Sequence, residues 1–384
     1  MGEFSVRDVF VHSMASYADS HPLSSDQRTA VSSILGCKTG AFGLNVQICE
    51  DCSHLQLHYC SCGNRNCPQC QQVKKEKWID QRRAEVMDTP YFHVVFTLPA
   101  QLRPLFLANQ TLLYDTLHRT VAKTLLVLSA DDKYLGATPA IIQVLHTWTQ
   151  TLEYHPHMHC IVSAGGLTRD LKFRKGASRF FIPVKVMMKV FRGKFMEALK
   201  EARNDGSLQI PASFAELLQS SVWKDYCHTL YETDWRPFVK ETFNGFGNAI
   251  DYLGRYTHKI AISNSRIIQV TDTHVTFWYR DRRDGGKRKE MVLENTEFIR
   301  RFLMHVLPKG FQKIRYFGLL NNRFKKRNLR LVFQIQGKQL YKARFSRNAP
   351  ASQILKELYN VDLCRCRKCG SLHTRYLGVM RRRC

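Results

Sequence analysis

The chain has 384 residues, of which 44% are hydrophobic and 11% aromatic, and its 58 Lys and Arg outnumber 32 Asp and Glu. This composition excludes a disordered chain and provides enough apolar residues for a buried core and more than one domain. The net charge of +26 favours a polyanionic partner, most simply nucleic acid.

The N-terminus has no secretory signal pattern, and no apolar run reaches the length of a membrane-spanning helix. We therefore expect a soluble, cytoplasmic protein with no membrane partner. In that reducing compartment the 13 cysteines indicate zinc ligands rather than a disulfide framework.

Residues 1–88 are predicted to form a zinc-binding, DNA-binding domain. Two short amphipathic helices, Val6–Ala18 and Ser25–Leu35, come first, and Ser24 has the character of a helix cap. Two Cys-x-x-Cys knuckles follow, and their spacing predicts that both bind one structural zinc ion. The ligands of that ion are Cys49, Cys52, Cys67 and Cys70.

The additional cysteines Cys37 and Cys62 leave two interpretations open. With His54 or His58 they complete a second zinc site, or they are small buried residues. A basic helix, Gln71–Val86, then ends this first unit, with lysines and arginines suited to phosphate contacts.

Residues 89–335 are predicted to form the main domain. A strand at Tyr91–Pro99 precedes a long helix or helix pair at Leu102–Ser129, and a second strand spans Ile141–Leu152. A third strand begins at Tyr154, after a short turn at Glu153 and Tyr154. Further helices are expected at Pro183–Ala202 and Ala212–Leu230.

The third strand contains a candidate metal site. Alternation along a strand places His157 and His159 on one face, so that both imidazoles can bind one divalent ion. In a hairpin with the preceding strand, Gln150 lies roughly opposite His157 and is the first candidate for a third ligand, with His146 second. A change of register alters that choice.

Two tyrosines four residues apart form a second candidate site. On a helix, Tyr252 and Tyr256 present both hydroxyls on one face, although an aromatic face packed on the sheet explains the same spacing. Arg255 and Lys259 lie beside them and are candidates for DNA contacts.

The remaining chain is basic. Strands are expected at Ile260–Val270, Val275–Arg280 and Lys289–Leu293, and the last two form a hairpin that turns at Gly285. Aromatic residues run into basic ones in this hairpin, a mixture suited to stacked bases and phosphates. A helix is expected at Glu297–Val306. The predicted DNA-binding side chains of this part of the chain are Arg280, Arg282, Lys325 and Lys326.

Residues 336–384 are predicted to be a basic C-terminal tail. Its cysteines are Cys364, Cys366, Cys369 and Cys384. With His373 they suggest a small zinc knuckle of its own, centred on the Cys366/Cys369 pair.

The order of these segments resembles the rolling-circle transposases of the insertion-sequence ninety-one-like family, which are HUH (His-hydrophobe-His) nucleases. The resemblance covers nearly the whole chain. It rests on Cys49 and Cys52 with Cys62–Cys70, on His93–Pro99, Leu145–Gln150 and His155–Cys160, and on Tyr252–Asn264 and Phe302–Phe311.

The resemblance implies a transposase that cleaves and rejoins single-stranded DNA. Tyr252 or Tyr256 would attack a phosphodiester, giving a 5′-phosphotyrosine and a free 3′-OH, with Mg²⁺ or Mn²⁺ at His157 and His159. It also implies Zn²⁺ in the N-terminal domain and, when the protein is bound to DNA, association with the bacterial nucleoid. No nucleotide cofactor is expected, because the chain has no phosphate-loop signature.

Two residues depart from the family pattern. Asn66 replaces a histidine before the Cys-Pro-x-Cys knuckle, and Cys60 replaces a polar residue, which leaves the ligands of a second zinc open. The alternatives are a rolling-circle replication initiator or relaxase and, in another class, a non-catalytic zinc-dependent DNA-binding protein. The expected fold is α+β, an antiparallel HUH palm with a ferredoxin-like layout flanked by the zinc domain and the basic tail.

Overall fold

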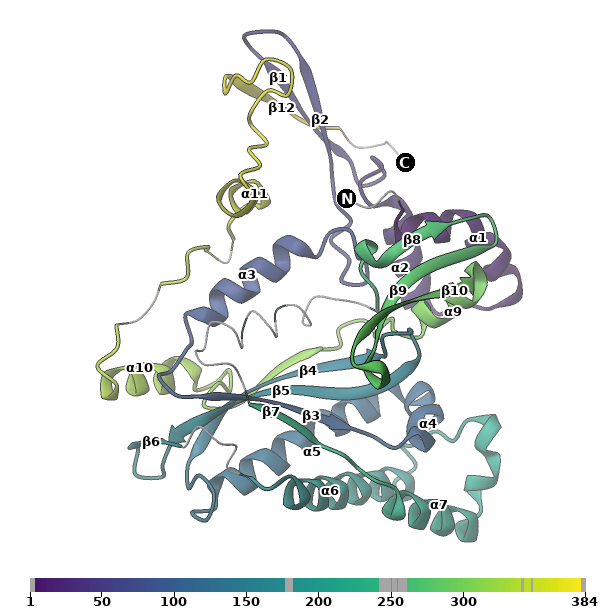
Figure 1. Cartoon of the computed structure of the whole chain (residues 1–384), viewed down its shortest axis with the longest axis vertical. Coiled ribbons are helices and arrows are strands. Elements are labelled where there is room, and N and C mark those ends of the chain that lie inside the picture. Colours follow the sequence, from purple (N-terminus) through teal and green to yellow (C-terminus); the bar gives the residue numbers. More distant parts are fainter. Residues whose placement is uncertain are drawn as a thin grey trace.

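A computed structural model of the chain describes residues 4–176, 182–241, 250, 254, 261–339, 342–346 and 348–380. Within them lie a large central sheet and two three-stranded sheets, all antiparallel (Figure 1). The predicted α+β class, with an antiparallel sheet and helices mainly on one face, is confirmed. None of the helices in the described part of the chain combines the length and apolar character needed to span a membrane.

The central sheet has the strand order β11-β4-β5-β3-β7, and β6 extends it by pairing with β5. The long strands β4 and β5 occupy its middle and are buried along most of their length. Its strands are β3 (Tyr91–Thr97), β4 (Thr138–Trp148), β5 (Tyr154–Leu167), β6 (Phe173–Lys175), β7 (Phe238–Glu241) and β11 (Ile314–Gly318).

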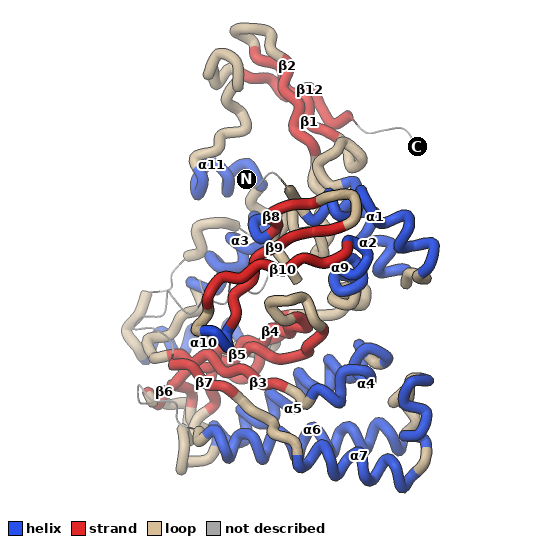
Figure 2. The backbone as a smooth tube through the Cα atoms, turned by 45° about the vertical axis from the view of Figure 1, so that its right-hand side comes forward, coloured by secondary structure: helices blue, strands red, loops and turns tan. Residues whose placement is uncertain are grey.

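One face of this sheet is covered by helices that alternate with its strands along the chain (Figures 1 and 2). These are the predicted helix pair, α4 (Arg103–Ala108) and α5 (Gln110–Ala130), then α6 (Val184–Asn204) and α7 (Ser220–Glu232). Every second residue of β3 and β5 points into this layer, including Phe96 and Met158, which have no exposed surface. Short 3₁₀ turns at Ala100–Leu102 and Ala212–Leu218 precede α4 and α7.

The opposite face of the sheet is covered by α3 (Gln72–Arg83) and α10 (Lys325–Ile335). Their apolar side chains, such as Ile79 and Phe333, pack against Val144 of β4 and the other strand residues of this face. The candidate site lies on this side of the sheet.

A second sheet, β8 (Ile267–Val270), β9 (His274–Asp281) and β10 (Lys287–Glu294), packs on three helices. These are α1 (Val6–Ser20), α2 (Ser25–Gly36) and α9 (Asn295–Leu303). Ser24 caps α2 as predicted, because its hydroxyl accepts from the Gln27 N–H at 3.2 Å. The N-terminal helices thus share a core with residues predicted to belong to the main domain.

The third sheet joins the two ends of the chain (Figure 2). Its order is β12-β1-β2, and its strands are β1 (Leu44–Cys49), β2 (Leu55–Tyr59) and β12 (Thr374–Met380). The helix α11 (Ala351–Tyr359) leads into it and packs near Val73 at the start of α3. The predicted C-terminal tail is therefore part of the same sheet as the N-terminal cysteine segment.

Candidate active site and metal centres

Three histidines from β4 and β5 meet on the α3 side of the central sheet. His146 pairs directly with His157 across the two strands, and His159 pairs with Val144. One ring nitrogen from each of His146, His157 and His159 lies within 4.8 Å of the others. This spacing fits three ligands of a single metal ion.

The predicted register of this hairpin is wrong by four residues, and His146 rather than Gln150 stands opposite His157. The cause is the connection, which runs from Thr149 to Glu153 instead of turning at Glu153 and Tyr154. The Thr149 hydroxyl accepts from the N–H of Glu153 at 3.1 Å, and Leu152 takes a left-handed φ of +65°. These contacts close a wider turn and shift every strand pair that follows.

Hydrogen bonds fix the rings of two of these histidines. Nδ1 of His157 lies 2.7 Å from the carbonyl oxygen of His155, and Nδ1 of His159 lies 2.7 Å from Nε2 of His93 on β3. Both bonds leave Nε2 as the ligand atom, an arrangement that metal-binding histidines commonly adopt. His155 is outside the group and contacts Arg103 at 3.2 Å, as expected from its place beside Pro156.

His93 is a site residue that the sequence prediction missed. It is 4% exposed and belongs to the same face of β3 as Tyr91. The sequence contains a signal for this role, because His93 lies in an apolar, β-branched strand, and a buried histidine there needs a hydrogen-bond partner.

An aromatic and a cation border the third histidine. The ring of Trp148 stacks on His146 with centroids 4.6 Å apart, and Nζ of Lys313 lies 4.7 Å from the centroid of Trp148. Burial, with Arg65 nearby, lowers the pKa of Lys313 to about 7. The histidine group is thus flanked by a flat apolar surface and a partly desolvated lysine.

The predicted nucleophiles, Tyr252 and Tyr256, lie outside the described residues, as do Arg255 and Lys259. Two neighbours of these residues are described. Ile250 is 1% exposed and packs with Ile79 and Val144, on the face of the sheet that carries the three histidines. A Cβ atom at Gly254 would lie 2.4 Å from Cδ1 of Ile79, so this position is in close contact with α3.

Among the described residues the cysteines form two groups of four, and neither matches the predicted set. The first contains Cys37, Cys62, Cys67 and Cys70, and the second contains Cys49, Cys52, Cys366 and Cys369. The prediction that the two N-terminal knuckles share one ion is therefore wrong, and so is the separate C-terminal knuckle. A knuckle fixes only two ligands, and the path of the chain decides which other pair it meets.

The first cysteine group lies between α2 and α3. Cys37 caps the C-terminus of α2, and Sγ of Cys62 lies 3.7 Å from Sγ of Cys70, just before α3. A hydrogen bond from the Cys67 thiol lowers the pKa of Cys70, while burial raises the pKa of Cys62, so Cys70 is the member of this group that most readily forms a thiolate. These ligands fit the zinc ion expected in this part of the chain, and His54 and His58 lie outside both groups.

The guanidinium of Arg65 connects this cysteine group to the loop before β11. It donates to the carbonyl oxygens of Leu307, Pro308 and Phe311. Two segments that carry the family resemblance, Cys62–Cys70 and Phe302–Phe311, are therefore in contact.

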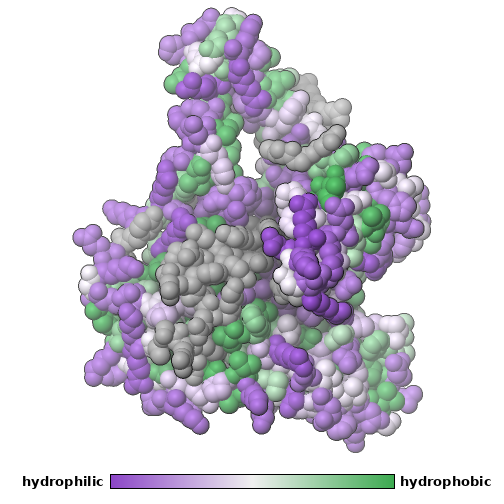
Figure 3. All heavy atoms as spheres, viewed as in Figure 1, coloured by the Kyte–Doolittle hydropathy of each residue, from purple (hydrophilic) through white to green (hydrophobic). Residues whose placement is uncertain are grey.

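The exposed surface of the β9–β10 hairpin is strongly hydrophilic (Figure 3), and basic side chains contribute to it. Arg280 is exposed there, and Arg288 lies over the ring of Trp278 at 4.9 Å, while the side chain of Arg282 lies outside the described residues. On α10, Lys326 is exposed, but Lys325 forms a 2.7 Å ion pair with Glu85. Part of the charge predicted for DNA binding is thus neutralised within the fold.

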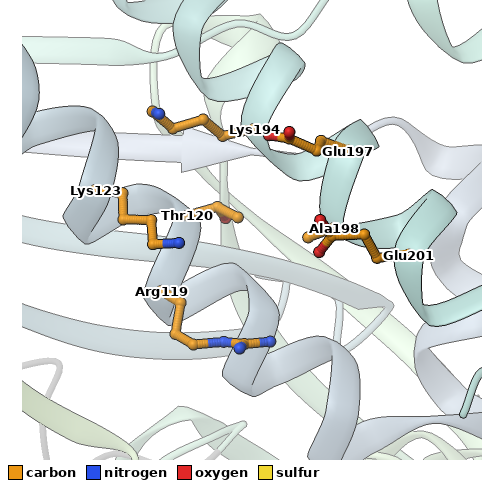
Figure 4. A pocket seen from close by; sticks show the side chains of 7 residues that line it. All are labelled: Arg119, Thr120, Lys123, Lys194, Glu197, Ala198 and Glu201. Atoms are coloured by element: carbon orange, nitrogen blue, oxygen red, sulfur yellow. The ribbon is translucent and has the colours of Figure 1, made fainter. Parts of the chain in front are cut away.

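A hollow of about 190 Å³ lies between α5 and α6 (Figure 4). Its lining includes Arg119, Lys123, Lys194, Glu197 and Glu201. Because both helices cover the opposite face of the central sheet, this hollow is separate from the histidine group.

Comparisons with known proteins match two parts of the chain to family models. Residues 140–328 match a family model described as "Putative transposase", and residues 9–98 match one described as "Transposase zinc-binding domain". No solved structure gives a significant match.

Two relatives align with most of the chain. The first, the "Putative transposase y4qJ" of Sinorhizobium fredii, is 40% identical over 84% of this chain and 82% of its own. The "Transposase for insertion sequence element IS801" of Pseudomonas savastanoi pv. phaseolicola is 31% identical over 89% of this chain and 81% of its own.

Proposed function

Because the chain belongs to the IS91-like family of transposases, we propose that it cleaves and rejoins single-stranded DNA through a 5′-phosphotyrosine, in rolling-circle transposition. The observation that carries this proposal is the position of Ile250 and Gly254. Ile250 packs on the sheet face that holds His146, His157 and His159. Gly254 contacts Ile79 of α3, the helix that covers this face, and both positions are close in sequence to Tyr252.

The tyrosines would supply the nucleophile. The phenol oxygen of Tyr252 or Tyr256 forms a bond to the scissile phosphorus while the bond from phosphorus to the 3′ oxygen breaks. The phenol loses its proton, and the leaving oxygen gains one to become a free 3′-OH. A phosphodiester is exchanged for a phosphotyrosine diester, so the link retains the energy for rejoining and no nucleotide cofactor is needed.

His146, His157 and His159 would hold a divalent ion, Mg²⁺ or Mn²⁺, with the remaining positions open to water and DNA phosphate. Such an ion polarises a phosphate and lowers the barrier to attack by a tyrosine, whose ordinary pKa is about 10. The chain's own contribution is orientation. His93 and the His155 carbonyl hold the rings of His159 and His157 with Nε2 directed to the shared centre.

The basic hairpin would bind the DNA strand. Arg280 is exposed, and the Arg288–Trp278 pair offers a cation and a ring for phosphates and stacked bases. Lys326 on α10 extends the positive surface, while Lys325 contributes less because Glu85 pairs with it.

The test is incubation with single-stranded DNA from the ends of the mobile element in Mn²⁺ or Mg²⁺. We expect a covalent protein–DNA adduct that the Tyr252→Phe/Tyr256→Phe variant does not form, while the control Tyr279→Phe still forms it. An adduct in the double variant would refute the tyrosine assignment. DNA binding without any adduct in the wild type would favour the non-catalytic alternative.

The way in which the element ends are processed distinguishes a transposase from a replication initiator or relaxase. A replication initiator or relaxase would form the same adduct but act on an origin rather than on both ends of an element. We expect joining of the cleaved end to a second DNA end in the same reaction, and its absence would argue for an initiator.

A further inference from the structure

We infer that Cys49, Cys52, Cys366 and Cys369 form one four-thiolate zinc site that fastens the C-terminal tail to the N-terminal sheet. Residues from the two ends of the chain, more than 300 positions apart, supply two ligands each. The family zinc-binding model covers residues 9–98 and so includes only half of this site.

The sulfur positions fit a zinc tetrahedron. Sγ of Cys49 lies 3.6 Å from Sγ of Cys369, and Sγ of Cys52 lies 3.7 Å from Sγ of Cys366. Four sulfurs at about 2.3 Å from zinc stand about 3.8 Å apart along the edges of a tetrahedron. A disulfide would require a separation of about 2.05 Å, so the spacing indicates a shared ion.

The two knuckles have the same backbone geometry, which is a second and independent observation. In each, the N–H of the residue after the second cysteine donates to the carbonyl oxygen of the first cysteine at 2.9 Å. That residue is Ser53 in one knuckle and Gly370 in the other, and both have a left-handed φ, +56° and +77°. Such a turn directs two thiolates toward one point, and two equivalent turns complete a four-ligand site.

Hydrogen bonds around the site already hold the two ends together. The N–H of Glu50 donates to the carbonyl of His373 at 2.9 Å, and the N–H of Arg367 donates to the buried side chain of Gln56 at 2.9 Å.

The site also connects the tail to the candidate active site. The segment before it contains α11, whose last residue, Tyr359, donates to Glu76 of α3 at 2.9 Å. The same α3 helix carries Ile79, which contacts Gly254. A tail held by zinc therefore supports the helix that Gly254 contacts.

The test is the zinc content of the full chain by native mass spectrometry and elemental analysis. We expect Cys366→Ser/Cys369→Ser to lose one zinc ion relative to the wild type. The matched control is Cys364→Ser, because Cys364 is exposed, lies two residues from the site and belongs to neither cysteine group. Unchanged zinc content in the double variant would overturn the inference.

A second pair of variants separates one shared site from two independent ones. Cys49→Ser/Cys52→Ser should lose the same single ion, and the fourfold variant should lose no more than either double variant. Loss of two ions in the fourfold variant, beyond one in each double variant, would show two independent sites and overturn the inference.

The serine variants could lose zinc simply because they misfold, so the wild-type protein provides a separate test. With ¹¹³Cd²⁺ in place of zinc, we expect two resonances of all-sulfur coordination, one for each cysteine group. The Cys369→His variant, which keeps a zinc ligand, should retain the ion and shift only one of the resonances. A single all-sulfur resonance in the wild type would contradict the shared site.

Discussion

Nε2 of His93 lies 2.7 Å from Nδ1 of His159, and the two imidazoles are buried on neighbouring strands of the central sheet. When Nε2 of His159 binds a metal ion, its Nδ1 must carry the proton and donate it to His93. His93 is therefore a positioning residue for the histidine group rather than a ligand.

We expect His93→Ala to weaken Mn²⁺ binding by about 10- to 100-fold, because the His159 ring loses the partner that fixes its orientation. Isothermal titration with Mn²⁺ measures the change. His155→Ala is the control, since that ring lies outside the group. His93→Gln, which keeps a hydrogen-bonding side chain, should recover part of the affinity, and equal affinities in all variants would contradict a positioning role.

The choice of third ligand gives a second prediction. We expect His146→Ala to reduce Mn²⁺ affinity and DNA cleavage by more than about 100-fold, whereas Gln150→Ala stays within a few-fold of the wild type. The reason is that His146, and not Gln150, stands opposite His157. The reverse result in a cleavage assay would restore the ligand set expected from the sequence.

The contact between Gly254 and Ile79 gives a third prediction. Gly254→Ala should lower the free energy of unfolding by about 1–3 kcal/mol, because the added methyl collides with Ile79. Adduct formation should fall as well. Ile79→Ala in the same chain removes the colliding atoms and should restore part of the activity.

The control for that pair is Gly193→Ala on α6, where the added methyl meets no atom within 4 Å. It should stabilise the helix slightly and leave adduct formation unchanged. If Gly254→Ala were as harmless as Gly193→Ala in thermal unfolding and adduct formation, the proposed docking on α3 would be wrong.

The hydrogen bonds from the Arg65 guanidinium to three carbonyl oxygens give a fourth prediction. Arg65→Lys should lower the free energy of unfolding by about 2–3 kcal/mol, because an ammonium group cannot reproduce the contacts to three carbonyl oxygens. Denaturant unfolding measures the loss. The exposed control Arg28→Lys should change the free energy of unfolding by less than about 0.5 kcal/mol. Equal losses in the two variants would show that the Arg65 hydrogen bonds do not stabilise the fold as described.

Burial of His118 gives a prediction about pH. This residue has no exposed surface, the Gln143 amide donates to its Nδ1, and desolvation lowers its pKa to about 3. The folded-state pKa lies below the unfolded value of about 6.5, so the unfolded chain takes up the proton first. The contribution of His118 to the free energy of unfolding is complete above pH 6.5 and falls as the pH drops toward 3.

Between pH 6.5 and 5 this loss amounts to about 2 kcal/mol. A His118→Gln variant cannot take up the proton, so its stability should fall less over this interval by about that amount. Denaturant unfolding at both pH values provides the measurement, and parallel losses in the two proteins would show that His118 does not titrate as described.

The local elements of this protein could be read from the sequence because they depend on neighbouring residues. Alternation placed His157 and His159 on one face of a strand, and helical periodicity with the Ser24 cap located α2. The order of motifs identified the transposase family. The strands β1, β2 and β12 were not predicted, since they are short, partly exposed and stable only when paired.

The tertiary structure alone decided which distant residues meet. The width of one turn, Thr149 to Glu153, brought His146 opposite His157, and the pairing of β12 with β1 brought Cys366 and Cys369 to Cys49 and Cys52. Sequence spacing restricts only the two ligands within a knuckle or along a strand. The remaining ligands depend on strand register and on the path of the whole chain, which the packing of buried faces determines.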